Sequence, residues 1–278
     1  MNRREIGRVS LFRSKRGTAL PVSFLMLFVS LTIIVSATFY VSVVEIQARG
    51  KLLNVAVARQ NMIALERSIE AAKWSPDTSI VCLFEDAGGL FLTHPADKNL
   101  LINITDGQFQ DTVFNDNLGR AVYQLPATET AISTLYMTGD RRAIINQTEF
   151  TMSQMYLSPG DVTPEVILTY RPLATISETG FENGKPVNTL RIYIISLNQS
   201  MDFVAQGRFR VKATCTEVVS QLHLYNFTNT VTSISVKATF DGRSDLVTLP
   251  VYSNTNGAFV QVETLLCGIK LERIQGGN

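Results

Sequence analysis

The sequence has little of the chemistry that enzymes and metal proteins need. It contains only two histidines, His94 and His223, and neither lies near cysteines or acids at the spacing of a zinc site or a nucleophile triad. No G-x-S-x-G, H-E-x-x-H or G-x-G-x-x-G motif occurs in it. We therefore expect no catalytic site, no metal site and no cofactor.

The chain also lacks a basic surplus outside its first residues. Six of its 25 Lys and Arg, and one of its 24 Asp and Glu, lie in residues 1–17. The remainder therefore carries 19 basic and 23 acidic side chains. Since a nucleic-acid-binding protein presents a basic face, this balance argues against a nucleic-acid partner. The positive charge belongs to a short N-terminal leader, residues 1–17.

Charge is absent altogether from the 27 residues Thr18–Val44. A helix of about 20 apolar residues crosses the core of a bilayer, so this run is long enough to span one. A secretory signal has a shorter apolar region of about 7 to 15 residues. Because Lys and Arg flank the run on its N-terminal side, we expect a single-pass membrane protein with the leader in the cytoplasm and everything after the span outside the cell.

Helix-forming residues continue beyond the span, and the next proline is Pro76. Apolar residues recur there at helical spacing and form one stripe. The stripe consists of Val55, Ala58, Met62, Leu65, Ile69 and Ala72. We predict one long helix over residues 18–75, with the membrane span at 18–44. We favour the stripe as a seam against the protein's own core over a partner-binding surface.

After the predicted helix the pattern changes to alternation with a period of two, which indicates β-strands. Two runs alternate apolar and polar residues, and a third is apolar enough to predict a central strand. These runs are RFRVKATC (208–215), SISVKATF (233–240) and NTLRIYIISLN (188–198). Strand formation therefore dominates the second part of the chain.

Turn signals divide this β-rich part. Asn183-Gly184 and Asp241-Gly242 are typical of two-residue hairpin turns. LSPGDVTP (157–164) is the best candidate for a linker. The sequence thus predicts an α+β fold, with a β-containing module over 76–160 and an all-β, sandwich-like domain over 161–278.

Three cysteines lie in the part expected outside the cell, where disulfides persist. Cys215 ends one strand-like run, and Cys267 lies in another, VQVETLLCGIKL. We favour a disulfide between Cys215 and Cys267, which leaves Cys82 as the odd thiol. The alternative is three buried free thiols, because cysteine is among the most buried residue types.

Four N-x-S/T sequons occur in the same part and are candidates for N-glycosylation. They are Asn103, Asn146, Asn198 and Asn226. Asn198 directly follows an apolar strand, so we expect it to fit an exposed turn best.

The run DTVFNDNLGR (111–120) groups oxygen-bearing side chains of the kind that bind calcium. Their spacing is not that of an EF-hand. We therefore favour a solvated turn over a metal site.

The N-terminal layout resembles that of type IV pilin precursors. The resemblance rests on the basic leader, the sequence Lys15-Arg16-Gly17, the uncharged run from Thr18, and its continuation into a long helix followed by a β-rich body. It covers residues 13–75 and the order of the elements. Such precursors carry a class III signal peptide, which implies that a prepilin peptidase cuts after Gly17 and leaves Thr18 as the mature N-terminus.

One position departs from the bacterial pattern. The fifth mature residue would be Val22, where typical bacterial pilins have glutamate. Leu20-Pro21-Val22 is similar to the start of archaeal pilins, so the resemblance is to an archaeal-type or a minor pilin. It implies a structural or adhesive filament subunit that contacts other pilin subunits through its N-terminal helix. The implied assembly machinery is a membrane platform and its ATPase.

Two other hypotheses stay open on the residues alone. The second hypothesis is an uncleaved, membrane-anchored protein that displays a β-sandwich to bind a ligand or partner at the cell surface. This hypothesis shares the topology of a pilin and differs in whether the leader survives. A surface hydrolase comes third, because no acid–base or nucleophile cluster supports it.

Overall fold

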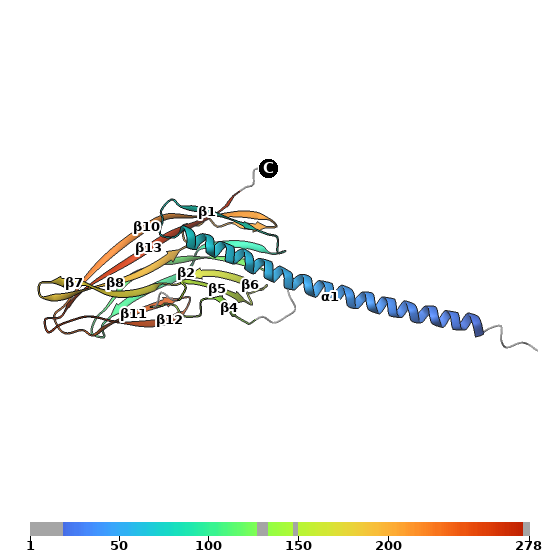
Figure 1. Cartoon of the computed structure of the whole chain (residues 1–278), viewed down its shortest axis with the longest axis horizontal. Coiled ribbons are helices and arrows are strands. Elements are labelled where there is room, and N and C mark those ends of the chain that lie inside the picture. Colours follow the sequence, from blue (N-terminus) through green and yellow to red (C-terminus); the bar gives the residue numbers. More distant parts are fainter. Residues whose placement is uncertain (1–18, 127–132, 147–149, 275–278) are drawn as a thin grey trace, which may run out of the picture. The chain divides into compact units, whose positions relative to one another are not determined.

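The computed structural model describes residues 19–126, 133–146 and 150–274 (Figure 1). The described residues form one α-helix followed by a series of β-strands. Contacts divide the chain into two compact units, Met1–Gly50 and Lys51–Asn278. The predicted α+β class, with a long apolar helix ahead of a strand-rich region, is confirmed.

The helix α1 (Ala19–Ala72) runs through 54 residues without a break. Pro21 lies in its first turn, where the backbone N–H groups have no helical partner and a proline costs little. At the other end, Trp74 adopts a positive φ of 63°, which terminates the helical conformation. The long helix predicted from the sequence is therefore confirmed for the described residues.

Five strands of the second unit form one sheet in the order β1-β10-β13-β8-β7. Neighbouring strands are antiparallel, except that β13 and β8 are parallel. The strands are β1 (Ser79–Phe84), β10 (Phe209–Phe227), β13 (Ala258–Ile274), β8 (Lys185–Ser196) and β7 (Leu173–Glu182). β8 covers all but the last two residues of the run predicted as a central strand and has a partner on each side, so that prediction is confirmed.

The remaining strands form a second, antiparallel sheet in the order β12-β11-β2-β3-β6-β5-β4. A short strand, β9 (Val204–Gln206), also pairs with β2. The others are β12 (Arg243–Pro250), β11 (Ser233–Phe240), β2 (Leu90–Thr105), β3 (Gln110–Gln124), β6 (Glu165–Tyr170), β5 (Ser153–Ser158) and β4 (Leu135–Thr138). β11 has the bounds of the run SISVKATF.

Both predicted hairpin turns are confirmed. Asn183 and Gly184 have φ values of 51° and 75° and join β7 to β8, while Asp241 and Gly242 have 51° and 71° and join β11 to β12. Positive φ at both central residues defines the turn that suits the twist of a hairpin, and it explains the N-G and D-G sequences.

Two local expectations meet a different structure. The run 111–120 is not a turn: it lies within β3, where Thr112 donates a 2.8 Å hydrogen bond to Asn103 across the strand pair. The predicted linker 157–164 takes in the last two residues of β5 and the short connection to β6, and these two strands pair with each other. Strands from both predicted modules pair with each other, as β1 does with β10 and β2 with β11.

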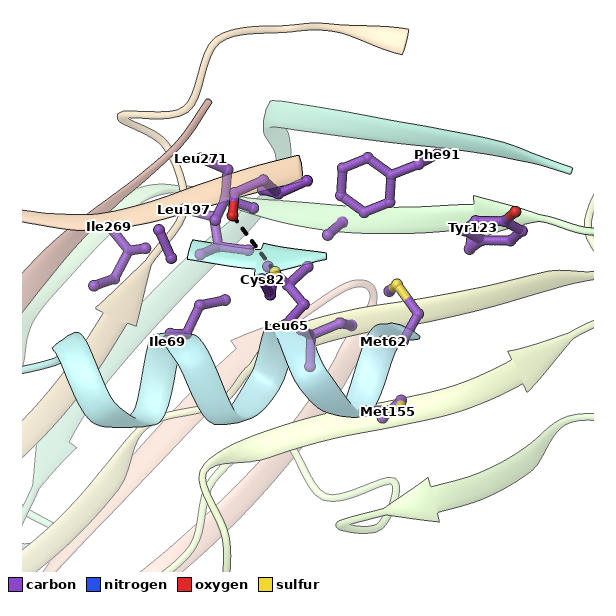
Figure 2. Packing of buried hydrophobic residues seen from close by; sticks show 14 of the residues in the cluster. Met62, Leu65, Ile69, Cys82, Phe91, Tyr123, Met155, Leu197, Ile269 and Leu271 are labelled. Atoms are coloured by element: carbon purple, nitrogen blue, oxygen red, sulfur yellow. Dashed lines mark hydrogen bonds between the residues drawn. The ribbon is translucent and has the colours of Figure 1, made fainter. Parts of the chain in front are cut away.

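The helical stripe packs into the core of the second unit, as predicted. The side chains of Ala58, Met62, Leu65, Ile69 and Ala72 have no solvent exposure. Figure 2 shows Met62, Leu65 and Ile69 pointing from α1 toward side chains contributed by strands of both sheets. A second cluster joins the two sheets farther along the strands, and it includes Ile102 of β2, Ile192 of β8 and Val260 of β13.

Candidate functional site

The first unit presents an apolar helical surface. From Val22 to Gly50 the described side chains are exposed except Val43, which is half-buried. The largest exposures include Phe24 at 73%, Phe39 at 70% and Tyr40 at 71%. Among the described residues, α1 is the one helix long and apolar enough to cross a membrane by length and composition. Exposed apolar patches of this extent mark surfaces that lipid or another protein covers.

Four hydroxyl groups within this surface are satisfied inside the helix itself. The Ser30 hydroxyl donates a hydrogen bond to the carbonyl of Leu27 at 2.9 Å. Three more hydroxyls donate to carbonyls at 2.8 Å each: Thr32 to Phe28, Thr38 to Ile34 and Ser42 to Thr38. Because each hydroxyl bonds a carbonyl of the preceding turn, it needs no water and no partner outside the helix. These four hydroxyls meet the requirement that polar groups in lipid find partners internally.

The apolar surface ends at an ion pair. Glu45 is the first charged residue after the leader, and its carboxylate accepts a hydrogen bond from Arg49 at 2.5 Å. Both side chains are exposed. The pair therefore marks the end of the segment suited to an apolar environment.

The predicted cleavage junction lies outside the described residues. Lys15, Arg16, Gly17 and Thr18 all precede the first described residue, Ala19. Cleavage after Gly17 therefore stays a prediction.

The structure brings two of the three cysteines together. The Sγ atoms of Cys215 and Cys267 are 3.6 Å apart, and both thiols are free and buried. Trp74 donates its backbone N–H to the sulfur of Cys267 at 3.5 Å, and burial raises the pKa of that thiol to about 12. Cys82 is a separate buried thiol that donates to the carbonyl of Val211. A Cys215–Cys267 bond stays a prediction, now with its two sulfurs adjacent.

The four sequons occupy different settings. Asn146 and Asn226 are exposed, and Asn226 accepts a 2.7 Å hydrogen bond from Lys185. Asn198 lies in the turn after β8, as expected, but it is half-buried. Asn103 is half-buried within β2, which has β3 and β11 on its two sides. Exposure therefore favours Asn146 and Asn226 over Asn198 as glycan acceptors.

A polar groove lies where β10 ends and the chain turns toward β11. Its volume is about 470 Å³, within the range of small-ligand sites, and its wall includes the turn between β2 and β3. The ring of Phe109 lies 5.4 Å from that of Tyr225 and 5.5 Å from that of Phe227. Tyr225 donates a 2.7 Å hydrogen bond to Asp111, and this bond lowers the pKa of the carboxyl. Sequence reasoning missed the groove, because its residues come from separate strand ends.

An ion pair with a buried arginine fixes the connection before β5. The Arg171 side chain has no solvent exposure and pairs with Asp140, which also accepts a hydrogen bond from Arg142 at 3.0 Å. Arg171 donates to the carbonyl of Thr151 at 3.1 Å as well. The hydrogen bonds from Arg142 and Arg171 hold the pKa of Asp140 well below its usual range. This network ties the chain before β5 to the residue that follows β6.

No protein family, no curated protein and no solved structure matches this chain. Within the described ranges, no group of three or more His, Cys, Asp or Glu side chains could hold a metal ion.

Proposed function

We propose that this protein is a pilin-like structural or adhesive subunit of a type IV pilus-like surface filament, processed after Gly17 by a prepilin peptidase. The observation that carries the proposal is the difference in solvent exposure between the two halves of α1. Its first half exposes an uninterrupted apolar surface, whereas Ala58, Met62 and Leu65 in its second half are fully buried in the β-rich unit. The first half of the helix thus suits an apolar environment, and the second half belongs to the folded β-rich unit.

In this proposal the apolar half of α1 has two successive environments. It first spans the membrane, which its length and internally bonded hydroxyls suit. After cleavage, the assembly platform and its ATPase would move it into a filament core of other subunits' helices. Small residues let helices approach closely in such surroundings. The candidates here are Ser23, Ser30, Ser36, Ala37, Thr38 and Ser42.

The β-rich unit is the part that would face outward. We propose a sandwich-like arrangement for it, supported by the second cluster, which contains residues of both sheets. This body would lie outside the cell, on the opposite side of the membrane from the basic leader.

A substitution at the junction tests the proposal. Gly17→Leu removes the residue before the cut while adding a side chain that suits an apolar span, so the leader should remain attached and the chain should stay in the membrane. Gly7→Leu is the matched control, because it changes a leader glycine away from the junction and should leave processing intact. Immunoblots of the membrane and sheared surface fractions show, for each variant, whether the leader is retained and in which fraction the protein is found. Identical processing of the two variants would contradict the assignment of Gly17.

A second candidate function has one observation in its favour. The groove beside Phe109 and Tyr225 has the volume of a ligand site. It favours a membrane-anchored binding protein if the leader is retained, and an adhesive subunit if the leader is removed. The mass of the mature N-terminus separates these two cases.

A further inference from the structure

Strand β10 has a long edge without a partner. β1 pairs with it only from Phe209 to Thr214, whereas β13 pairs with it through to Phe227. From Glu217 to Phe227, no strand in the described part of the chain bonds the other side of β10. Figure 1 shows β10 along the margin of its sheet. Along this stretch of eleven residues, every second residue therefore directs its backbone N–H and C=O groups to a side without a partner strand.

Beyond the register shift between Cys215 and Glu217, this edge has none of the features that natural proteins use to block edge-to-edge pairing. Proline, lysine and bulges are the usual protections. The segment 217–227 contains no proline and no lysine, and its register with β13 is regular. Two other edges are protected: β12 ends at Pro250, and β7 carries Glu178, Glu182 and a register shift. The open edge of β10 is therefore suited to pairing.

Two leucines on this edge are exposed. Leu222 is 63% and Leu224 is 61% exposed, and alternation places both on the same face of β10. His223, between the two leucines, and Tyr225, after the second, point to the other face and are half-buried. Leu222 and Leu224 thus form a small apolar patch beside open backbone groups.

We propose that a second copy of this chain pairs with this edge, antiparallel, with His223 at the two-fold axis. An isologous contact of this kind joins the same strand of both copies and continues the sheet from one to the other. With His223 opposite His223, each Leu222 lies opposite the Leu224 of the other copy. Both leucines of each chain are then covered by leucine.

The choice of copy and register follows from self-complementarity. Residues directly opposite in an antiparallel pair share a face. A two-fold axis perpendicular to the sheet must therefore pass between two copies of the same residue, and moving it to the next residue shifts the pairing by two positions. A change in one direction places Leu224 opposite Ser220, and a change in the other places Leu222 opposite Asn226. The only charged residue of the segment, Glu217, falls opposite position 229, an asparagine, so no like charges meet.

The contact lies entirely within the second unit and is independent of the filament proposal. It pairs β-rich bodies through their sheets, whereas the filament proposal concerns the apolar half of α1. A glycan on Asn226, opposite Ser220 of the other copy, would obstruct it.

Disulfide trapping tests the register. In the full-length chain in native membranes, His223→Cys places two cysteines opposite each other, about 4.5 to 5.5 Å apart at Cα. This separation is within the range that a disulfide bridges. Ser220→Cys is the control, because its two copies lie six positions apart, about 20 Å. After catalysed air oxidation, we expect at least fivefold more covalent dimer for His223→Cys than for Ser220→Cys or the unmodified chain.

A second set of variants shows whether the leucines cause the pairing. In the His223→Cys background, Leu222→Lys with Leu224→Lys should return the dimer to the Ser220→Cys level. Leu246→Lys, at a 56% exposed leucine on β12, should leave it unchanged. Equal crosslinking of His223→Cys and Ser220→Cys, or a dimer that survives both lysines, would overturn the proposal. Neither result depends on whether the leader is cleaved.

Discussion

The seam between α1 and the strands provides a quantitative test of the fold. Leu65 has no solvent exposure and points from α1 into the cluster shown in Figure 2. Truncation of a buried leucine to alanine costs about 2 to 5 kcal/mol, the sum of lost transfer energy and the cavity left behind. Because the strands of both sheets surround this position and limit its collapse, we expect Leu65→Ala to lower the free energy of unfolding by about 3 kcal/mol.

The same helix offers a matched control. Leu52 is 72% exposed and lies in the same unit as Leu65. Alanine is at least as good a helix former as leucine, so Leu52→Ala should change the stability by no more than about 0.5 kcal/mol. The pair therefore separates burial from helix propensity.

Trp74 is the reporter for this experiment. It is the only tryptophan in the chain, and its ring lies 5.6 Å from that of Tyr193, edge to face. Urea titration of the full-length chain in detergent, followed by Trp74 fluorescence, should show the midpoint of Leu65→Ala about 1.2 M lower, given a slope of about 2.5 kcal/mol per M. A loss below about 1 kcal/mol, or equal midpoints for the two variants, would refute the packing of this seam.

The ion pair of buried Arg171 and the thiol pair give further predictions. Asp140→Asn leaves Arg171 buried without a charged partner and should cost about 2 to 3 kcal/mol at pH 7, at the low end for such pairs because Asp140 is 39% exposed. Since the folded pKa of Asp140 is depressed, its stabilisation is complete above the unfolded value of about 3.9 and is lost progressively as pH falls from that value through the folded pKa. Chemical unfolding should therefore show a smaller difference in unfolding free energy between the unmodified chain and Asp140→Asn at pH 3 than at pH 7. A difference that does not change with pH would contradict the role of the charge. Under oxidation, peptide mapping should find Cys215 linked to Cys267 and Cys82 reduced, because only the first two sulfurs lie 3.6 Å apart. A disulfide that includes Cys82 would contradict this pairing.

Local patterns in the sequence were sufficient for the helix, the hairpins and several strands. The helical stripe with Met62 and Leu65 predicted the buried face of α1, because a period near 3.6 has one structural interpretation over this length. Asn183-Gly184 and Asp241-Gly242 predicted their turns, because each requires positive φ at both residues.

Long-range pairing could not be predicted in the same way. Nothing in the local sequence indicates that β8 and β13 are parallel neighbours, or that β1 pairs with β10. Position 111–120 was predicted as a turn because Asn and Asp favour turns, but the pairing of β3 with β2 outweighs that preference. The exposure of Leu222 could not be predicted either, since alternation does not reveal which strand forms the edge of a sheet.

Of the candidate site, the sequence predicted the apolar segment and the proximity of Cys215 to Cys267. It did not predict the groove at Phe109 and Tyr225, whose walls come from strand ends distant in the chain.

The N-terminal mass of the native protein tests the central claim most directly. It should be measured on intact protein recovered both from membranes and from sheared surface material, in a host with a working prepilin peptidase. A mature chain that begins at Thr18, and that is present in the sheared fraction, is the result that a processed pilin-like subunit predicts. A chain that still begins at Met1 or Asn2 and stays in the membrane would contradict it and would leave an anchored surface-binding protein.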